Sequence, residues 1–394
     1  MTIQLLNEDK LMDGVFMKRS ASGILFVGIL LPLWLAPVTQ ADWSFVMMGD
    51  TRGERDTTAT GVSTYLDAIA LKIASLSLKP ALVLVGGDLV NGNDVPPSSV
   101  LTNYSLQFAN WKTAMQPVFN YSTGSGIPIY PVRGNHENCD NEGPTVNHLK
   151  AAYDEAFKAY VPANGPDYGS TNNQVGFSYS FTHSNVTFVA ADQYFYYNDP
   201  TGYHELARSW VIERFQQTNS PYKVFMAHEP IFNSESSTAG GFFGDSAAGL
   251  QTRADFWNAL GTNGVQLYLT GHIHNETVAS TTNDYGNTII QLLAGNGGAA
   301  LEPIKNEHEP GIDVLYTNDT QYGFSLATVG DTSMTIEYYL LDTSDNSWSV
   351  ASYTTVIQPV PEPGSLILLA AAATALTGLR CARRNPNPMG SGAP

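Results

Sequence analysis

The sequence predicts an α/β fold, and three observations support this prediction. Short apolar runs, rich in β-branched and aromatic residues, alternate with stretches of helical pattern between residues 42 and 358. The chain has 394 residues and is 43% hydrophobic, which is enough to bury a sizeable core. No low-complexity linker or repeat interrupts residues 42–358, so we expect this stretch to form one continuous globular domain.

We expect strands at the apolar runs and helices at the stretches between them. The expected strands are Ser44–Met48, Ala81–Val85, Ile127–Val132, Val186–Ala190, Lys223–Ala227, Val265–Leu269, Thr288–Leu293, Phe324–Val329 and Met334–Tyr339. The expected helices are Val62–Ser77, Leu106–Met115, Val146–Tyr160, Glu205–Gln217 and Thr252–Leu260.

Residues 1–41 have the features of a secretory signal peptide. Lys18 and Arg19 form a basic region, residues 24–35 are apolar, and small residues up to Ala41 suit cleavage by signal peptidase. Acidic residues, which do not suit a signal peptide, precede Met17. We therefore expect translation to begin at Met17 and cleavage to follow Ala41.

Residues 359–394 end the chain with a Pro-Glu-Pro triplet at 361–363, an apolar run at 365–379 and three arginines. This order of parts resembles the PEP-CTERM sorting signal of Gram-negative bacteria. The resemblance implies processing by an exosortase-type enzyme, transient anchoring in the inner membrane, and a final location in the periplasm, on the outer surface or in the extracellular matrix. The apolar run is shorter than the roughly 20 residues that span a bilayer, so a weak anchor alone is the alternative.

Charge and cysteine content exclude several classes of function. The formal net charge of −17 argues against nucleic acid as the main partner, because phosphate backbones bind basic surfaces. A small phosphorylated substrate stays possible, since a local metal site can neutralise its charge. Cys139 and Cys381 are the only cysteines, so we expect neither a disulfide framework nor a thiolate zinc site.

Polar residues of the kinds that bind metals follow several expected strands. Those that come just after an apolar run are Asp50, Asp88, Asn135, His136, His228, His272 and His274. Singly, such residues are also typical of turns, helix caps and half-buried histidines. Ligands of open α/β sheets gather beyond the carboxyl ends of the strands, so we expect these loops to converge on one site. The two histidines of His-x-His would face the same way in an extended segment.

In this order the motifs resemble those of the calcineurin-like metallophosphoesterase family. The matching segments are Gly49-Asp50-Thr51-Arg52, Gly87-Asp88 with Gly92, Gly134-Asn135-His136-Glu137, His228 and Gly271-His272-Ile273-His274. The resemblance implies a four-layer α/β/β/α sandwich of two mixed β-sheets. It also implies hydrolysis of a phosphomonoester or phosphodiester by a metal-bridging hydroxide.

The same resemblance implies two metal ions. Asp50, Asp88 and His274 would hold the first ion, and the second would be held by Asp88, Asn135, His228 and His272. Oxygen and imidazole ligands suit manganese, iron or zinc, so the identity of the metals stays open.

His136 is the expected catalytic proton donor or phosphate brace, because the family directs this histidine at the substrate. Glu137 either orients His136 or a nearby ligand, or caps the turn. Asp192 is expected only to brace the loop of His228.

Arg52 departs from the family pattern, in which an Asp-x-His motif places a histidine on the first metal. A guanidinium has no lone pair to donate, so Arg52 cannot be a ligand. Either the first metal has fewer protein ligands plus water, or another side chain substitutes. We hypothesise that Arg52 binds the substrate phosphate and that the first metal is held more weakly.

Two alternatives stay open at this point. The first is a surface or matrix binding protein on a catalytically impaired scaffold, which Arg52 and the sorting signal favour and the ligand set opposes. The second is chemistry like that of purple acid phosphatases. Its tyrosine ligand would lie three residues after Asp88, where this chain has Asn91.

Overall fold

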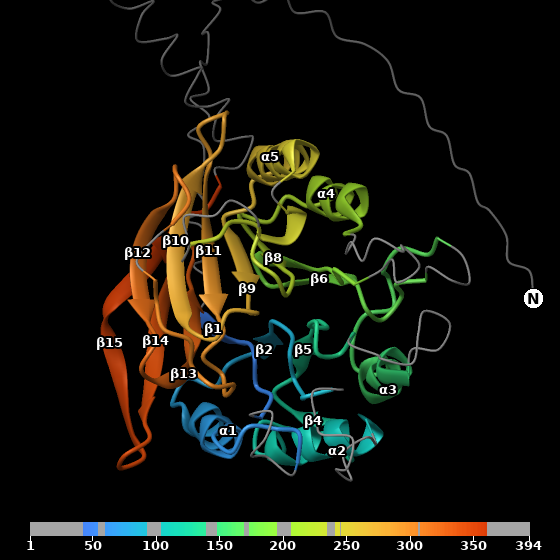
Figure 1. Ribbon diagram of the computed structural model, residues 1–394, viewed down its shortest axis with the longest axis vertical. Coiled ribbons are helices and arrows are strands. Elements are labelled where there is room, and N and C mark those ends of the chain that lie inside the picture. The colour runs from blue at the N-terminus through green and yellow to red at the C-terminus, as the bar shows by residue number, and fades with distance from the viewer. Residues whose placement is uncertain are drawn as a thin grey trace, which may run out of the picture. The chain divides into compact units, whose positions relative to one another are not determined.

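A computed structural model describes residues 42–53, 60–92, 104–138, 148–168, 173–194, 206–234, 241–244, 246–305 and 308–360. Within these ranges the fold is the predicted α/β sandwich, with two large mixed sheets and helices outside them (Figure 1). The expected signal peptide, residues 361–394 of the expected sorting signal, and Cys139 lie outside the described residues. None of the described helices has the length and apolar character needed to cross a membrane.

The first sheet combines a parallel and an antiparallel half. Its strands are, in spatial order, β15 (Ser347–Ile357), β14 (Met334–Asp342), β13 (Tyr322–Val329), β1 (Trp43–Met48), β2 (Leu82–Val85) and β5 (Ile129–Pro131). β1, β2 and β5 are parallel, whereas β13, β14 and β15 pair antiparallel. The three parallel strands therefore end at the same edge of this sheet.

The second sheet has a parallel centre and antiparallel edges. Its order is β12 (Asp313–Asn318), β10 (Glu276–Thr282), β11 (Thr288–Ala294), β9 (Leu267–Thr270), β8 (Tyr222–Met226), β7 (Val186–Ala190) and β6 (Tyr179–His183). β7, β8, β9 and β11 run parallel, with β6, β10 and β12 antiparallel to their neighbours. Two short strands, β3 (Phe119–Asn120) and β4 (Ser125–Gly126), form a separate pair.

Helices cover the outer face of each sheet (Figure 1). The first sheet packs against α1 (Leu66–Ser75), α2 (Tyr104–Ala114) and α3 (His148–Phe157), and the second against α4 (Arg208–Gln216) and α5 (Ala247–Thr262). A short 3₁₀ helix, η2 (Gly241–Phe243), precedes α5. Ser246 caps α5 by accepting a hydrogen bond from the backbone N–H of Gly249 at 3.0 Å.

Three apolar cores explain why the central strands read as continuous hydrophobic runs. In β1, Phe45 and Met47 enter the core between the two sheets, while Val46 and Met48 enter the core under the helices. A strand that is buried on both faces needs apolar residues at every position, in contrast to a strand with one solvated face. The third core lies between the second sheet and α4 and α5.

Every expected strand and helix forms, with shifted ends. The expected helix Val62–Ser77 begins at Leu66, and the expected helix Thr252–Leu260 extends to Ala247–Thr262. Apart from the two-residue strands β3 and β4, four strands lie outside the expected set: β6, β10, β12 and β15. They contain many polar residues, because each has positions that are only partly buried.

Candidate metal centre

The loops that follow β1, β2, β5, β8 and β9 meet at the carboxyl ends of the parallel strands. They bring together all the predicted site residues, which are Asp50, Arg52, Asp88, Asn135, His136, His228, His272 and His274. Both sheets contribute loops, so the site lies at the carboxyl ends of the parallel strands of both sheets. Most of these side chains are buried, including Asp50 and His228 at 0% exposure.

Strained backbone positions hold several of these residues in place. Among the described non-glycine residues, five have positive φ, and three of them are Asp50 (54°), Asp88 (52°) and His272 (77°). Nearby glycines let the chain approach closely. A Cβ on Gly134 would overlap Asp88 Oδ1, and a Cβ on Gly271 would overlap Asp50 Oδ2. At Gly134 and Gly271 the absence of a side chain therefore leaves space for the two carboxylates.

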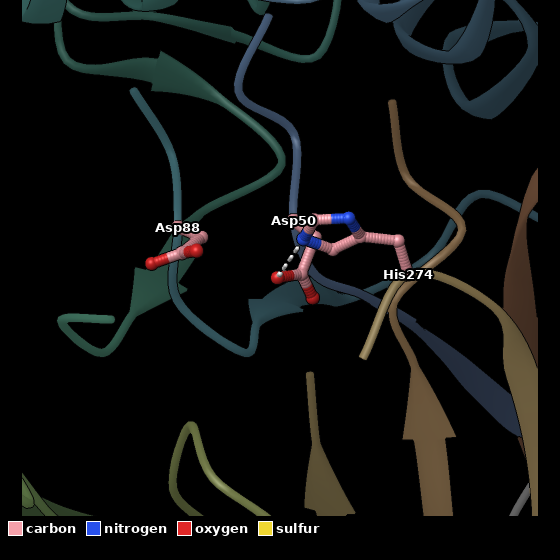
Figure 2. Close-up of side chains that lie close together, drawn as sticks. All are labelled: Asp50, Asp88 and His274. Carbon is pink, nitrogen blue, oxygen red and sulfur yellow. Dashed lines mark ion pairs between the residues drawn. The ribbon is translucent and has the colours of Figure 1, made fainter. Parts of the chain in front are cut away.

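A first group of ligand atoms comes from Asp50, Asp88 and His274. One ligand atom from each lies within 4.8 Å of the others, and Figure 2 shows His274 turned toward Asp50 with Asp88 alongside. His274 Nε2 is 3.8 Å from Asp50 Oδ1. His274 Nδ1 lies 3.0 Å from the carbonyl oxygen of Ala300, so Nδ1 carries the proton and Nε2 keeps a lone pair for a metal.

A second group consists of Asp88, Asn135, His228 and His272. Asn135 Oδ1 lies 3.0 Å from both His228 Nε2 and His272 Nδ1, and His228 Nε2 lies 3.4 Å from Asp88 Oδ1. Donor atoms bound to one ion at about 2.0–2.2 Å are separated by about 3–3.6 Å, so these distances suit a shared metal.

The tautomer of His228 makes the case for a cation stronger. His228 Nδ1 donates to the carbonyl oxygen of Gly86 at 2.7 Å, so Nε2 presents a lone pair. That lone pair faces Asn135 Oδ1, which is also an acceptor, and the carboxylate of Asp88. Three acceptors that face one another in a buried site repel each other, and a cation between them would remove that repulsion.

Asp88 lies between the two groups. Its Oδ1 faces His228 and accepts a hydrogen bond from the backbone N–H of His136 at 3.0 Å. Its Oδ2 lies 3.6 Å from Arg52 Nε and 3.7 Å from His136 Nε2. The two oxygens of one carboxylate therefore face different neighbours, and Asp88 is the residue that the two groups of ligands share.

The carboxyl groups of the site are electrostatically unequal. Burial alone would raise the pKa of Asp88, but that pKa is lowered to about 2 by its neighbours His228, His136 and Arg52. The pKa of Asp50 is raised well above its usual range by burial and by the nearby Asp88 charge. Two buried carboxylates side by side thus require added positive charge to ionise together.

The imidazoles of the site are held in the form that binds metal. Burial lowers the pKa of His228 to about 4. Burial, and then the charge of Arg52, lower the pKa of His274 to about 3. Both rings are therefore neutral at physiological pH, and a neutral imidazole has the lone pair that coordination needs.

His136 faces the site without belonging to either group of ligands. Its Nδ1 lies 3.0 Å from the carbonyl oxygen of Asn91, so Nδ1 carries a proton and Nε2 points toward Asp88 Oδ2. His136 is 7% exposed, which leaves a narrow approach for another molecule. The ring is thus placed to move a proton at Nε2.

Glu137 caps two loops at once. Its carboxylate accepts hydrogen bonds from four backbone N–H groups, at 2.7–3.0 Å, those of Asp88, Leu89, Val90 and Gly134. Of the two expected roles, the observed contacts are those of a cap, and the cap joins the loop of Asp88 to the loop of Asn135.

Replacing Glu137 with glutamine is expected to destabilise the fold by about 2–4 kcal/mol, because donors of the amide face buried N–H groups that then lack an acceptor. Chemical denaturation of the metal-free protein measures this loss. A matched control is Glu213→Gln on α4, because more than half of that side chain is exposed and water can replace its hydrogen bonds. Equal effects of the two substitutions would contradict the capping role.

Arg133 and Asp192 form a buried ion pair that sequence reasoning missed. Arg133 Nε is 3.2 Å from Asp192 Oδ2, and both residues are 1% exposed. Asp192 therefore braces the loop of Asn135, whereas the expectation was the loop of His228. The next residue, Gln193, accepts a hydrogen bond from the N–H of Glu229 beside His228. Pairing across two loops leaves no local sequence signal.

The glycine-rich segment 293–298 lies against the loop that carries Asp50, a member of the first group of ligands. Gly297 N–H donates to Gly49 O at 3.1 Å, and Ala299 N–H donates to Asp50 O at 2.8 Å. The backbone of this segment thus fixes the loop that carries Asp50, as expected for a turn near the metals.

Comparison with known proteins identifies the family. A sequence profile described as calcineurin-like phosphoesterase matches residues 44–276, which is more than half of the chain and contains every site residue. The chain belongs to the calcineurin-like phosphoesterase family. Membership makes hydrolysis of phosphoric esters the activity to expect, and the family implies a centre of two metal ions. The two groups of ligand atoms fit such a centre. Among curated protein sequences, none matches the chain.

Solved structures of phosphatases share the fold. A purple acid phosphatase from seeds of yellow lupin (Lupinus luteus) is 18% identical, with a TM-score of 0.56 over 81% of this chain and 54% of that chain. PhoD is 15% identical, with a TM-score of 0.54 over 81% and 70%. GAP50, the anchor in the inner membrane complex of Plasmodium, is 15% identical, with a TM-score of 0.52 over 82% and 91%.

These likenesses show the fold of the calcineurin-like phosphoesterase domain. The chain spans about half the length of the yellow lupin protein. Asn91, at the position where a purple acid phosphatase would have tyrosine, is buried and provides the carbonyl that holds His136.

Proposed function

We propose that this protein is an exported phosphoesterase that hydrolyses a small phosphomonoester or phosphodiester with the help of two metal ions. The observation that carries the proposal is the meeting of acceptors around His228 Nε2. Asn135 Oδ1 at 3.0 Å and Asp88 Oδ1 at 3.4 Å face its lone pair, and a cation bound there would stabilise all three acceptors. Manganese, iron and zinc all suit these ligands.

Bound ions would neutralise the phosphate, orient it and make a water molecule more acidic. The residues of the chain would hold these ions in position. Asp88 belongs to both groups of ligands and would therefore contribute to holding both ions. Asp50 and His274 complete one side, and Asn135 with the remaining histidines completes the other.

His136 supplies the proton for the departing oxygen. Its Nδ1 proton is fixed by the carbonyl of Asn91, so the exchangeable position is Nε2 on the side of the metals. Proton donation to an alkoxide is worth about 10²–10⁴ in rate, and the benefit is largest for poor leaving groups.

Export is proposed from the two ends of the chain. Lys18, Arg19 and the following apolar run favour a cleaved signal peptide, and the residues after Val360 favour a sorting signal. Signal peptidase and an exosortase-type enzyme would be the processing partners. If cleavage follows Ala41, N-terminal sequencing of protein secreted from a Gram-negative host will begin at Asp42; an uncleaved Met17 would refute export by this route.

Hydrolysis of two reporters tests the function. The purified protein is stripped with a chelator and assayed on para-nitrophenyl phosphate and bis-para-nitrophenyl phosphate, with manganese, iron or zinc restored separately. We expect metal-dependent turnover, and the preferred reporter distinguishes a monoesterase from a diesterase. Folded protein that binds metal and hydrolyses neither reporter would favour a surface or matrix binding role on a catalytically impaired scaffold.

A further inference from the structure

Arg52 lies inside the first group of ligands. It follows Asp50 in the loop after β1, and its backbone N–H donates to the carbonyl oxygen of Asp88 at 3.0 Å. Its loop pairs with Val62 through an isolated bridge, and only 12% of its side chain is exposed. The guanidinium is therefore a permanent positive charge in a buried site.

The guanidinium uses the same lone pair that a metal would use. Arg52 Nη2 is 3.3 Å from His274 Nε2. Because His274 Nδ1 already donates to Ala300 O, Nε2 is an acceptor and Arg52 is the donor. An ion held by His274 must therefore displace this hydrogen bond.

A second atom of Arg52 lacks a hydrogen-bond partner among the described residues. Arg52 Nε is buried and makes no hydrogen bond within the described part of the chain. It lies 3.6 Å from Asp88 Oδ2, outside hydrogen-bonding distance, and so faces the bridging carboxylate. Nη1 donates to Gly53 O at 3.3 Å. The guanidinium thus has unused donor capacity directed at the site.

We propose that Arg52 makes the metal centre asymmetric by competing with one of its two ions. An ion binds tightly among Asp88, Asn135, His228 and His272, because Arg52 faces only Asp88 of these four and makes no hydrogen bond to its carboxylate. The set of Asp50, Asp88 and His274 binds an ion only when the guanidinium releases His274. Once released, its planar donors are free to bind the phosphate of the substrate. This inference rests on the proposed function.

Metal titration separates the two sites. Zinc is titrated into the chelator-stripped full-length protein by calorimetry, and bound zinc is counted after dialysis. For the wild type we expect one tight ion and a second ion that binds about 100-fold or more weakly. Arg52→Gln removes the charge at similar size and is expected to bring the second affinity to within about 10-fold of the first.

Two further variants test whether the charge of Arg52 causes the weak binding of the second ion. Arg52→Lys keeps the charge at this position and is expected to leave the second ion weak. Arg214→Gln removes an arginine charge on α4, where Arg214 pairs with Glu213, and is expected to leave both affinities unchanged. Circular dichroism confirms that each variant is folded.

The outcomes are distinguishable. Two ions of equal affinity in the wild type, or a second affinity that Arg52→Gln does not raise, would overturn the inference. Unequal zinc binding that responds to Arg52→Gln, in a protein that hydrolyses neither reporter, would support the inference and reject the proposed function. Hydrolysis by a protein that binds its two zinc ions with equal affinity would support the proposed function and reject the inference.

Discussion

Replacing Asp88 with asparagine is expected to lower hydrolysis by about 10³-fold or more, because the anion between the two groups of ligands is lost. Asparagine keeps the shape of the side chain, can still accept the N–H of His136, and tolerates the positive φ of 52°. The fold is therefore expected to survive. Bound metal, counted by elemental analysis, should fall together with activity.

The control for this substitution is Asp67→Asn, which removes the same charge from an exposed side chain in the first turn of α1. It should leave metal content and turnover unchanged. Asp88→Asn protein with full metal content and near-normal turnover would show that Asp88 does not bridge the ions.

Replacing His136 with glutamine is expected to lower turnover by about 10²–10⁴-fold on an alkyl phosphate with a poor leaving group. The same variant should lose far less activity on para-nitrophenyl phosphate, whose leaving group departs without a proton. The difference follows from the position of Nε2, which faces the site while Nδ1 is fixed by Asn91 O. Steady-state kinetics on both substrates measures it.

Metal content provides the control for His136, whose Nδ1 is held by Asn91 O and whose Nε2 lies 3.7 Å from Asp88 Oδ2. His136→Gln protein is expected to keep its bound metal. An equal loss of activity on both substrates would assign His136 to bracing the phosphate, and loss of metal would assign it to the ligand set.

Much of the fold could be predicted from the sequence because burial leaves a local signal. The strand β1 is apolar at almost every position, since Phe45 and Val46 enter cores on opposite faces. Strand β10 has no such signal. Thr281 and Thr282 are not fully buried, and the buried carboxylate of Glu276 is tolerated because it accepts hydrogen bonds from Ser325 and Asn296. Only tertiary structure provides those partners.

In the site, too, some features have a local sequence signal and others depend on tertiary structure. Residues that follow strands, such as Asp50 and His228, could be predicted because the carboxyl ends of parallel strands converge. The hydrogen bond between Arg52 and His274 joins positions 222 residues apart, so no local pattern indicates it. The ion pair of Arg133 with Asp192 is equally non-local. Sequence order indicates which residues meet, but the individual contacts depend on the fold.

Anomalous X-ray diffraction from crystals grown with zinc tests the central claim most directly. The account predicts a strong peak among Asp88, Asn135, His228 and His272. It also predicts a weaker peak about 3.5–4 Å away, beside Asp50 and His274. Zinc bound elsewhere, with no peak at Asp88, would contradict the assignment of this strand-end site as the metal centre.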